Sequence, residues 1–111
     1  MEFNTYQQRA KETAIYPDQD KIGGLVYAAL GLAGEAGEFA NKVKKVLRDH
    51  GGEVPPELRQ ELLLELGDTQ WYLASATTEL GAYLEAVAQM NLDKLQDRKR
   101  ELTIGGEGDH R

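Results

Sequence analysis

The sequence predicts an all-α protein, a bundle of about four helices. Apolar residues recur at three- and four-residue steps over most of its 111 residues, and no segment shows sustained apolar/polar alternation. Clusters of glycine and proline divide the chain into helical segments. The length fits a single domain. We therefore expect one helical domain over residues 1–104, followed by a glycine-rich tail over residues 105–111.

The four helices are expected over residues 5–13, 22–47, 55–80 and 83–102. Asn4, with Gln7 three residues later, has the pattern of a capping box that starts the first helix. The turn-forming cluster 49–52 should end the second helix. The Pro55-Pro56 pair suits the first turn of the third helix, and Gly81 is a natural terminator for it.

The second helix has two different faces. One is an apolar stripe that we expect to form the core: Ile22, Val26, Ala29, Ala33, Ala36, Ala40, Val43 and Leu47. The opposite face carries small residues and then charged ones: Gly24, Ala28, Gly31, Glu35, Glu38 and Lys42. Each interior glycine costs about 1 kcal/mol relative to alanine. The small residues therefore predict that another helix approaches this face closely.

The third helix is predicted to be largely buried, because apolar residues cover most of its circumference. They form a stripe and its flanks: Leu62, Leu66, Leu73, Ala76 and Leu80, with Leu63, Leu64, Trp71 and Ala74. The polar residues narrow to one line: Glu61, Glu65, Asp68, Tyr72, Ser75 and Glu79. Because both long helices have two faces to cover, we expect the bundle to be completed by oligomerisation.

Two carboxylate pairs stand at helical spacing, Glu35 with Glu38 and Glu65 with Asp68. Buried carboxylates need a counter-charge. If the two pairs face each other, they offer four hard oxygen donors, which suit Mg²⁺, with Mn²⁺ as a substitute. A di-iron site is disfavoured, because the helices of such proteins carry Glu-x-x-His and this chain has no such motif.

Ion pairing is the alternative account of these acidic residues. Basic residues cluster at 42–48 and 94–100, and they can neutralise the acids as salt bridges. The two histidines, His50 and His110, fall in a turn and in the tail. The chain has no cysteine, which excludes disulfides, thiolate nucleophiles and cysteine metal sites.

The overall charge limits the partners. A formal net charge of -6 makes duplex nucleic acid an unfavourable partner. A bound cation reverses the local field of an acidic site, so small phosphorylated ligands stay compatible with it. No apolar run is long enough to cross a membrane, and the N-terminus lacks the apolar stretch of a signal peptide, so we expect a cytoplasmic protein.

Three ordered motifs resemble those of the MazG-like nucleoside triphosphate pyrophosphohydrolases. They are GLAGEAGE at residues 31–38, ELGDTQWYLA at 65–74 and NLDKLQDR at 91–98. The resemblance spans most of the chain. It implies an all-α, MazG-like helical bundle, usually a homodimer or homotetramer, that converts a nucleoside triphosphate to a monophosphate and pyrophosphate.

The resemblance also assigns roles to residues. Glu35, Glu38, Glu65 and Asp68 match the metal ligands of the family and are the expected catalytic residues. Mg²⁺ would bridge phosphate oxygens, neutralise developing charge and activate the attacking water. The expected substrate-binding residues are Lys42, Lys45, Trp71, Tyr72, Asn91, Lys94 and Arg98. Trp71 also fits an ordinary core position, and Lys94 and Arg98 also fit structural ion pairs with Glu65 or Glu61.

One position departs from the family pattern, because many members carry two adjacent glutamates where this chain has Gly34 and Glu35. The number of metal ions and the general base therefore stay open, with Glu61 as a substitute for the missing carboxylate. The proposed role is cleaning of the nucleotide pool. The alternative, which the missing carboxylate favours, is a catalytically silent helical module that binds a nucleotide or a protein.

Overall fold

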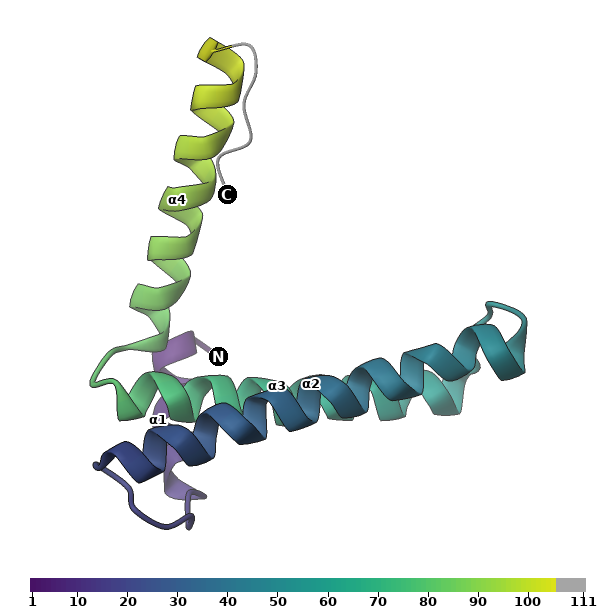
Figure 1. The fold of residues 1–111 in the computed structure, drawn as a ribbon, viewed down its shortest axis with the longest axis horizontal. Helices are drawn as coiled ribbons and strands as arrows, with labels where there is room; N and C mark the ends of the chain where they lie inside the picture. The colour runs from purple at the N-terminus through teal and green to yellow at the C-terminus, as the bar shows by residue number, and fades with distance from the viewer. Residues whose placement is uncertain (106–111) are drawn as a thin grey trace.

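The computed structural model describes residues 1–105 and consists of four helices in this range: α1 (Phe3–Glu12), α2 (Ile22–His50), α3 (Pro56–Glu79) and α4 (Leu84–Gly105) (Figure 1). The all-α prediction with about four helices is confirmed. Helix α4 takes in Gly105, the first residue of the expected tail, and the rest of that tail, with His110, lies outside the described residues.

Helices α2 and α3 form a long hairpin (Figure 1). Helix α2 ends where Gly51 adopts a left-handed conformation, with φ of 61°, and the N–H of Gly52 donates to the carbonyl of Val46 at 3.0 Å. Pro56 then begins α3 at a position where a missing N–H costs nothing. Because the connection is short, the two helices lie antiparallel and side by side along most of their length (Figure 1).

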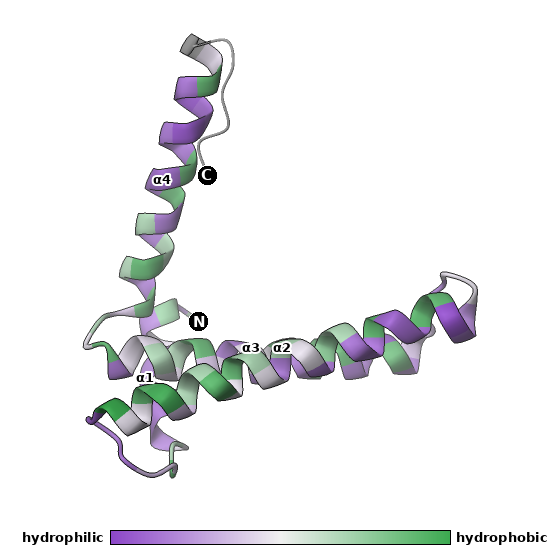
Figure 2. Cartoon of the chain, viewed as in Figure 1, coloured by the Kyte–Doolittle hydropathy of each residue, from purple (hydrophilic) through white to green (hydrophobic). Residues whose placement is uncertain are grey.

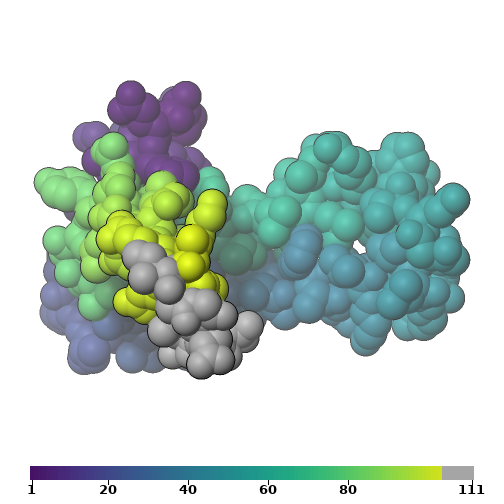
Figure 3. Space-filling model, turned by 90° about the horizontal axis from the view of Figure 1, so that it is seen from above, coloured from purple at the N-terminus to yellow at the C-terminus, as the bar shows by residue number. Residues whose placement is uncertain are grey.

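Helix α4 projects away from this hairpin, so the chain has an open, L-shaped form with extents of 46 × 45 × 27 Å (Figure 1). Helix α1 packs at the corner, against α3 and the start of α4, whereas α2 and α4 make no contact within the described part of the chain. Figure 3 shows the far end of the hairpin standing free of the corner. None of the helices combines the length and the apolarity needed to span a membrane in residues 1–105.

The capping prediction for the first helix is wrong in an informative way. Helix α1 starts at Phe3, so Asn4 lies inside it. The side chains of Asn4 and Gln7 instead accept the N–H groups of Glu85 and Leu84, at 3.1 and 2.7 Å, at the free N-terminus of α4. Gln7 also donates to the carbonyl of Ala82 at 3.0 Å. Side chains of α1 therefore cap the N-terminus of α4 and fix the direction of that helix.

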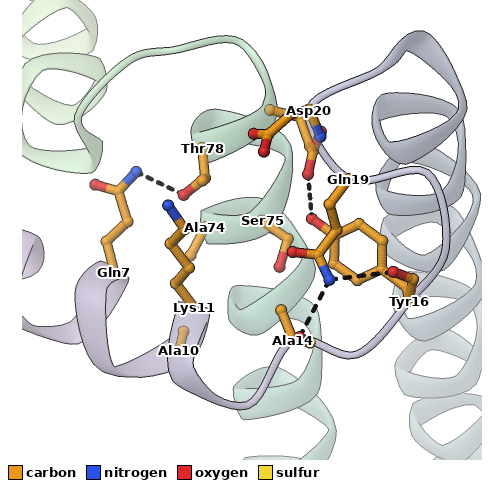
Figure 4. Close-up of a pocket in the computed structure, with 11 residues that line it drawn as sticks. Gln7, Ala10, Lys11, Ala14, Tyr16, Gln19, Asp20, Ala74, Ser75 and Thr78 are labelled. Carbon is orange, nitrogen blue, oxygen red and sulfur yellow. Dashed lines mark hydrogen bonds between the residues drawn. The ribbon is translucent and has the colours of Figure 1, made fainter.

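The loop between α1 and α2 is held against α3 (Figure 4). Gln19 folds back onto the loop and donates to the carbonyls of Ala14 and Tyr16, both at 3.1 Å. Glu79 is the anchor on α3, because its carboxylate accepts the hydroxyl of Tyr16 and the N–H of Asp20. The loop therefore presents the Tyr16 ring to the start of α2.

The apolar stripe of α2 does not form the core of the single chain, so this expectation is wrong. All eight of its residues are exposed, with Ile22 at 75% and Leu47 at 80%. The expected burial of α3 is also incomplete, since Leu64 and Leu80 are exposed. The polar and small-residue faces of the two helices meet instead. Figure 2 shows hydrophobic residues along the hairpin and along α4, and many of them remain exposed.

Candidate metal and nucleotide site

The close approach predicted for the small-residue face of α2 is confirmed. Ala28 is completely buried, at 0% exposure. A Cβ atom placed on Gly31 would overlap the ring of Tyr72, and one on Gly24 would lie 2.6 Å from the Glu79 carboxylate. These glycines let the backbone of α2 lie directly on the polar line of α3. The candidate site is built on this contact.

Three carboxylates converge between the two helices. One oxygen each from Glu35 of α2 and from Glu65 and Asp68 of α3 lie within 4.8 Å of one another. The spacing explains the convergence, because Glu65 and Asp68 are one turn apart on the face of α3 that meets Glu35. Glu35 and Glu65 are half-buried and Asp68 is exposed, so the group, which we call the carboxylate cluster, is open on one side.

Lys42 is the cation at this cluster. Its Nζ lies 3.0 Å from Oε1 of Glu65, and the two side chains are only 28% and 14% exposed. This contact with Lys42 lowers the pKa of the Glu65 carboxyl below its ordinary value. Partial burial raises the pKa of Glu35, and the neighbouring carboxylates of Glu65 and Asp68 raise it further. The one ammonium at the cluster, that of Lys42, therefore does not offset the negative charge around Glu35, and a proton or a cation there would be favoured.

The second oxygen of Glu65 indicates what the cluster lacks. Oε2 of Glu65 is buried and has no hydrogen-bond partner among the described residues. Unpaired buried oxygens are rare and costly in folded proteins. A hard divalent cation would meet three carboxylates there and would satisfy this oxygen. The donor set fits Mg²⁺ or Mn²⁺, both of which prefer oxygen ligands.

Two other expected carboxylates lie at the edge of the site. Glu38 is exposed and is not one of the three residues whose oxygens converge, although its charge contributes to the raised pKa of Glu35. Glu61, one turn before Glu65, is also exposed. A side chain at Gly34 would have open space around it. The ligand role of Glu38 and the substitute role of Glu61 stay predictions.

Four aromatic rings form a chain of contacts, and one of them, Tyr72, lies near the carboxylate cluster. Tyr16 stacks on Tyr27 at 5.0 Å between ring centroids, Trp71 meets Tyr72 edge-on at 5.0 Å, and Tyr27 lies 6.4 Å from Tyr72. The indole N–H of Trp71 donates to the hydroxyl of Thr13 at 2.8 Å. Burial raises the pKa of Tyr72, and the neighbouring Tyr27 and then the carboxylates of Glu35 and Asp68 raise it further. The rings therefore form an aromatic wall that continues from the cluster.

Tyr16 and Tyr27 were missed at the level of sequence. Tyr27 had a detectable signal, because it precedes Gly31 by four residues and Glu35 by eight, and so lies on the same face of α2. Tyr16 had none, since only the anchoring of its loop by Glu79 brings it beside Tyr27.

The basic residues expected at the substrate divide into two groups. Lys42 is at the cluster, and Lys45 is half-buried one turn further along α2. Asn91, Lys94 and Arg98 lie on α4, which makes no contact with α2 in residues 1–105. Lys94 and Arg98 make no ion pair within residues 1–105. The alternative prediction, that they pair with Glu65 or Glu61, is therefore not met within a single chain.

Comparison with known proteins agrees with this geometry. The family model for the MazG nucleotide pyrophosphohydrolase domain matches residues 27–103, which include α3, most of α2 and nearly all of α4. The chain belongs to this family. The MazG domain thus contains the carboxylate cluster and points to a nucleotide pyrophosphohydrolase. The chain is also 51% identical to the Gene 37 protein of Mycobacterium phage L5, over the full length of both proteins. No solved structure matches it.

Proposed function

We propose that the protein is a Mg²⁺-dependent hydrolase that converts nucleoside or deoxynucleoside triphosphates to the monophosphate and pyrophosphate. The observation that carries the proposal is the carboxylate cluster of Glu35, Glu65 and Asp68, with one buried oxygen that lacks a partner, inside a matched MazG domain. We place this activity in the cytoplasm, as cleaning of the nucleotide pool.

The carboxylates would hold the metal, and Glu38 would join them as the fourth ligand. When bound, Mg²⁺ supplies positive charge that neutralises the phosphate oxygens in the transition state, and it lowers the pKa of water. In the reaction, an oxygen of water bonds to the α-phosphorus, and the bond from this phosphorus to the α–β bridging oxygen breaks. Pyrophosphate leaves with that oxygen, and the proton of the water passes to a base that we leave unassigned between Glu38 and Glu61.

The aromatic wall would receive the nucleoside, because the faces of Trp71 and Tyr72 are of the kind on which bases stack. Lys42 and Lys45 lie on the side of α2 that would meet the phosphates, where an ammonium acts as a point charge. The site thus combines a charged end and an aromatic end, as a nucleotide does.

A homodimer or homotetramer is part of the proposal. Residues with large apolar side chains are exposed along both helices of the hairpin and along α4, for example Leu30 at 70% and Met90 at 70%. Most of the stability of a helix in a protein comes from tertiary packing, and the 22-residue helix α4 packs within residues 1–105 only against α1 and α3 at the corner. A second copy would cover these surfaces, and its α4 would bring Asn91, Lys94 and Arg98 to the phosphates. Light scattering should give a mass of at least two chains at micromolar concentration, and a monomer would contradict this part of the proposal.

The reaction is tested by incubating the protein with a panel of canonical and modified nucleoside triphosphates, with Mg²⁺, Mn²⁺ or EDTA. We expect equal amounts of monophosphate and pyrophosphate with Mg²⁺ or Mn²⁺, and no products with EDTA. Release of inorganic phosphate and a diphosphate would mean attack at the γ-phosphorus and would contradict the proposed reaction. The ranking of substrates would define the preferred base and sugar.

A second candidate is a catalytically silent module that binds a nucleotide or a protein. It is favoured by the ion pair that Lys42 already makes with Glu65 and by the absence of a carboxylate at Gly34. It predicts no products from any triphosphate, with a melting temperature that EDTA and Mg²⁺ leave unchanged. If Mg²⁺ raised the melting temperature but no triphosphate were hydrolysed, the metal site would be supported and the proposed catalysis would be contradicted.

A further inference from the structure

The ammonium of Lys42 lies beside the carboxylate cluster, so a metal ion bound there would be close to a second positive charge. Its ammonium contacts Oε1 of Glu65, and Oε2 of the same carboxylate is the buried oxygen without a partner. Glu35 and Asp68 offer their oxygens nearby. A cation bound by oxygen at about 2.1 Å on Oε2 would therefore lie within roughly 7 Å of the ammonium. Lys42 and the metal would share one carboxylate.

We propose that Lys42 is a resident counter-ion that makes this site bind the metal–nucleotide complex in preference to the bare metal. The inference rests on the proposed function and assigns an order to its binding steps. Without nucleotide, the ammonium of Lys42 repels a divalent cation on the carboxylate cluster. When a triphosphate arrives with its metal, the same ammonium contacts a phosphate oxygen, and the repulsion is offset by this new attraction.

Two effects of Lys42 oppose each other, and their sizes decide the direction. Lys42 orients Glu65, and loss of such an orienting partner weakens metal binding in many sites. Here the Glu65 side chain is only 14% exposed, so packing already restricts its orientation. Even with the dielectric constant of water, repulsion between a divalent cation and an ammonium at about 7 Å changes affinity roughly sevenfold, and a shorter separation changes it more. Because packing holds Glu65 in place, we expect the loss of orientation to cost less than this, so that the electrostatic effect decides the direction.

Lys44 offers a matched control on the same helix. It is exposed, and it makes no ion pair or side-chain hydrogen bond within the described chain. Replacing it by methionine removes the same charge and shortens the side chain by the same amount as in Lys42→Met. A general effect of net charge would act in both variants, whereas the proposed effect belongs to Lys42 alone.

The test measures two affinities by titration calorimetry in the wild type, Lys42→Met and Lys44→Met. One ligand is Mn²⁺ alone, and the other is the Mn²⁺ complex of an α,β-methylene nucleoside triphosphate, which cannot be cleaved at that position. Lys42→Met should bind Mn²⁺ about tenfold more tightly and the complex about tenfold more weakly than the wild type. Lys44→Met should match the wild type for both. A merely structural role would move both affinities in the same direction.

Lys42→Gln, which keeps a hydrogen-bond donor without the charge, provides a second variant should methionine disturb the fold, as monitored by circular dichroism. It should also bind Mn²⁺ more tightly. Weaker or unchanged Mn²⁺ binding in both Lys42 variants, with a wild type that binds the metal, would overturn the inference and leave the proposed function standing. A wild type that binds neither Mn²⁺ nor the complex would overturn both.

Discussion

Replacing Gly31 by alanine tests the close contact that builds the site. The added Cβ would overlap the ring of Tyr72, whose position is fixed by the neighbouring rings of Trp71 and Tyr27. Overpacking of this kind costs about 1–3 kcal/mol. Removing a glycine from a helix interior returns about 1 kcal/mol. The net loss in the free energy of unfolding should therefore be about 1 kcal/mol.

Gly37 is the control, because it lies in the same helix and a Cβ there would meet nothing within 4 Å. Gly37→Ala should gain up to about 1 kcal/mol, since only the helix propensity changes. The two variants differ in the overlap with Tyr72 alone, so their stabilities should differ by about 2 kcal/mol.

The assay is urea unfolding followed by circular dichroism, with the protein concentration held constant because assembly would add to the apparent stability. For a chain of this size, a difference of about 2 kcal/mol corresponds to a difference of roughly 8 °C or more in melting temperature. If Gly31→Ala proves as stable as Gly37→Ala, α2 and α3 do not approach as closely as the structure requires. The geometry of the carboxylate cluster between them would then also be wrong.

Two further predictions concern the corner of the molecule. Burial and the Glu79 carboxylate raise the pKa of Tyr16 to about 12, so its contribution to stability is complete below the ordinary tyrosine pKa of about 10 and is lost as the pH rises towards 12. The stability advantage of the wild type over Tyr16→Phe in urea unfolding should shrink by about 2 kcal/mol between pH 9 and 12, and a constant advantage would contradict the contact. Gln7→Ala should lower the free energy of unfolding by about 1–2 kcal/mol, because the N–H of Leu84 loses its cap. Gln8 is an exposed neighbour, and Gln8→Ala should leave the free energy of unfolding almost unchanged. Equal losses in the two variants would refute the capping role.

The helices themselves could be predicted because they depend on local patterns. The spacing of apolar residues, the Gly51–Gly52 turn and the prolines before α3 located all four helices within a few residues. The cap at Asn4 could not be predicted, because its partner is at Glu85, far along the chain. Local pattern cannot distinguish a cap for the same helix from a cap for another one.

The core was predicted on the wrong face for a physical reason. The hydrophobic pattern of α2 indicates which side must eventually leave water, and it does not indicate whether α3 or another molecule covers it. Within one chain, α3 takes the side with Gly24, Ala28 and Gly31, because those residues permit the closest packing of polar faces. The apolar stripe of α2 has no cover within residues 1–105, and the proposed assembly would cover it.

The carboxylate cluster was predictable in composition and only partly in geometry. Spacing placed Glu35, Glu65 and Asp68 on facing helix surfaces, and the structure brings these three together. Spacing also treated Glu38 as their equal, although it points to a more exposed position. The pairing of Lys42 with Glu65 depends on the register between the two helices, which no single-helix pattern contains.

The most direct test of the central claim compares pyrophosphate release by the wild type with that of Glu35→Gln and Asp68→Asn. The control is Glu53→Gln, which removes an exposed carboxylate from the turn between α2 and α3. With Mg²⁺ and a cleavable triphosphate, both cluster variants should lose activity by roughly 100-fold or more while keeping their helical circular dichroism, and Glu53→Gln should retain the wild-type rate. Metal-dependent release that survives both cluster substitutions would contradict the claim that these carboxylates hold the metal.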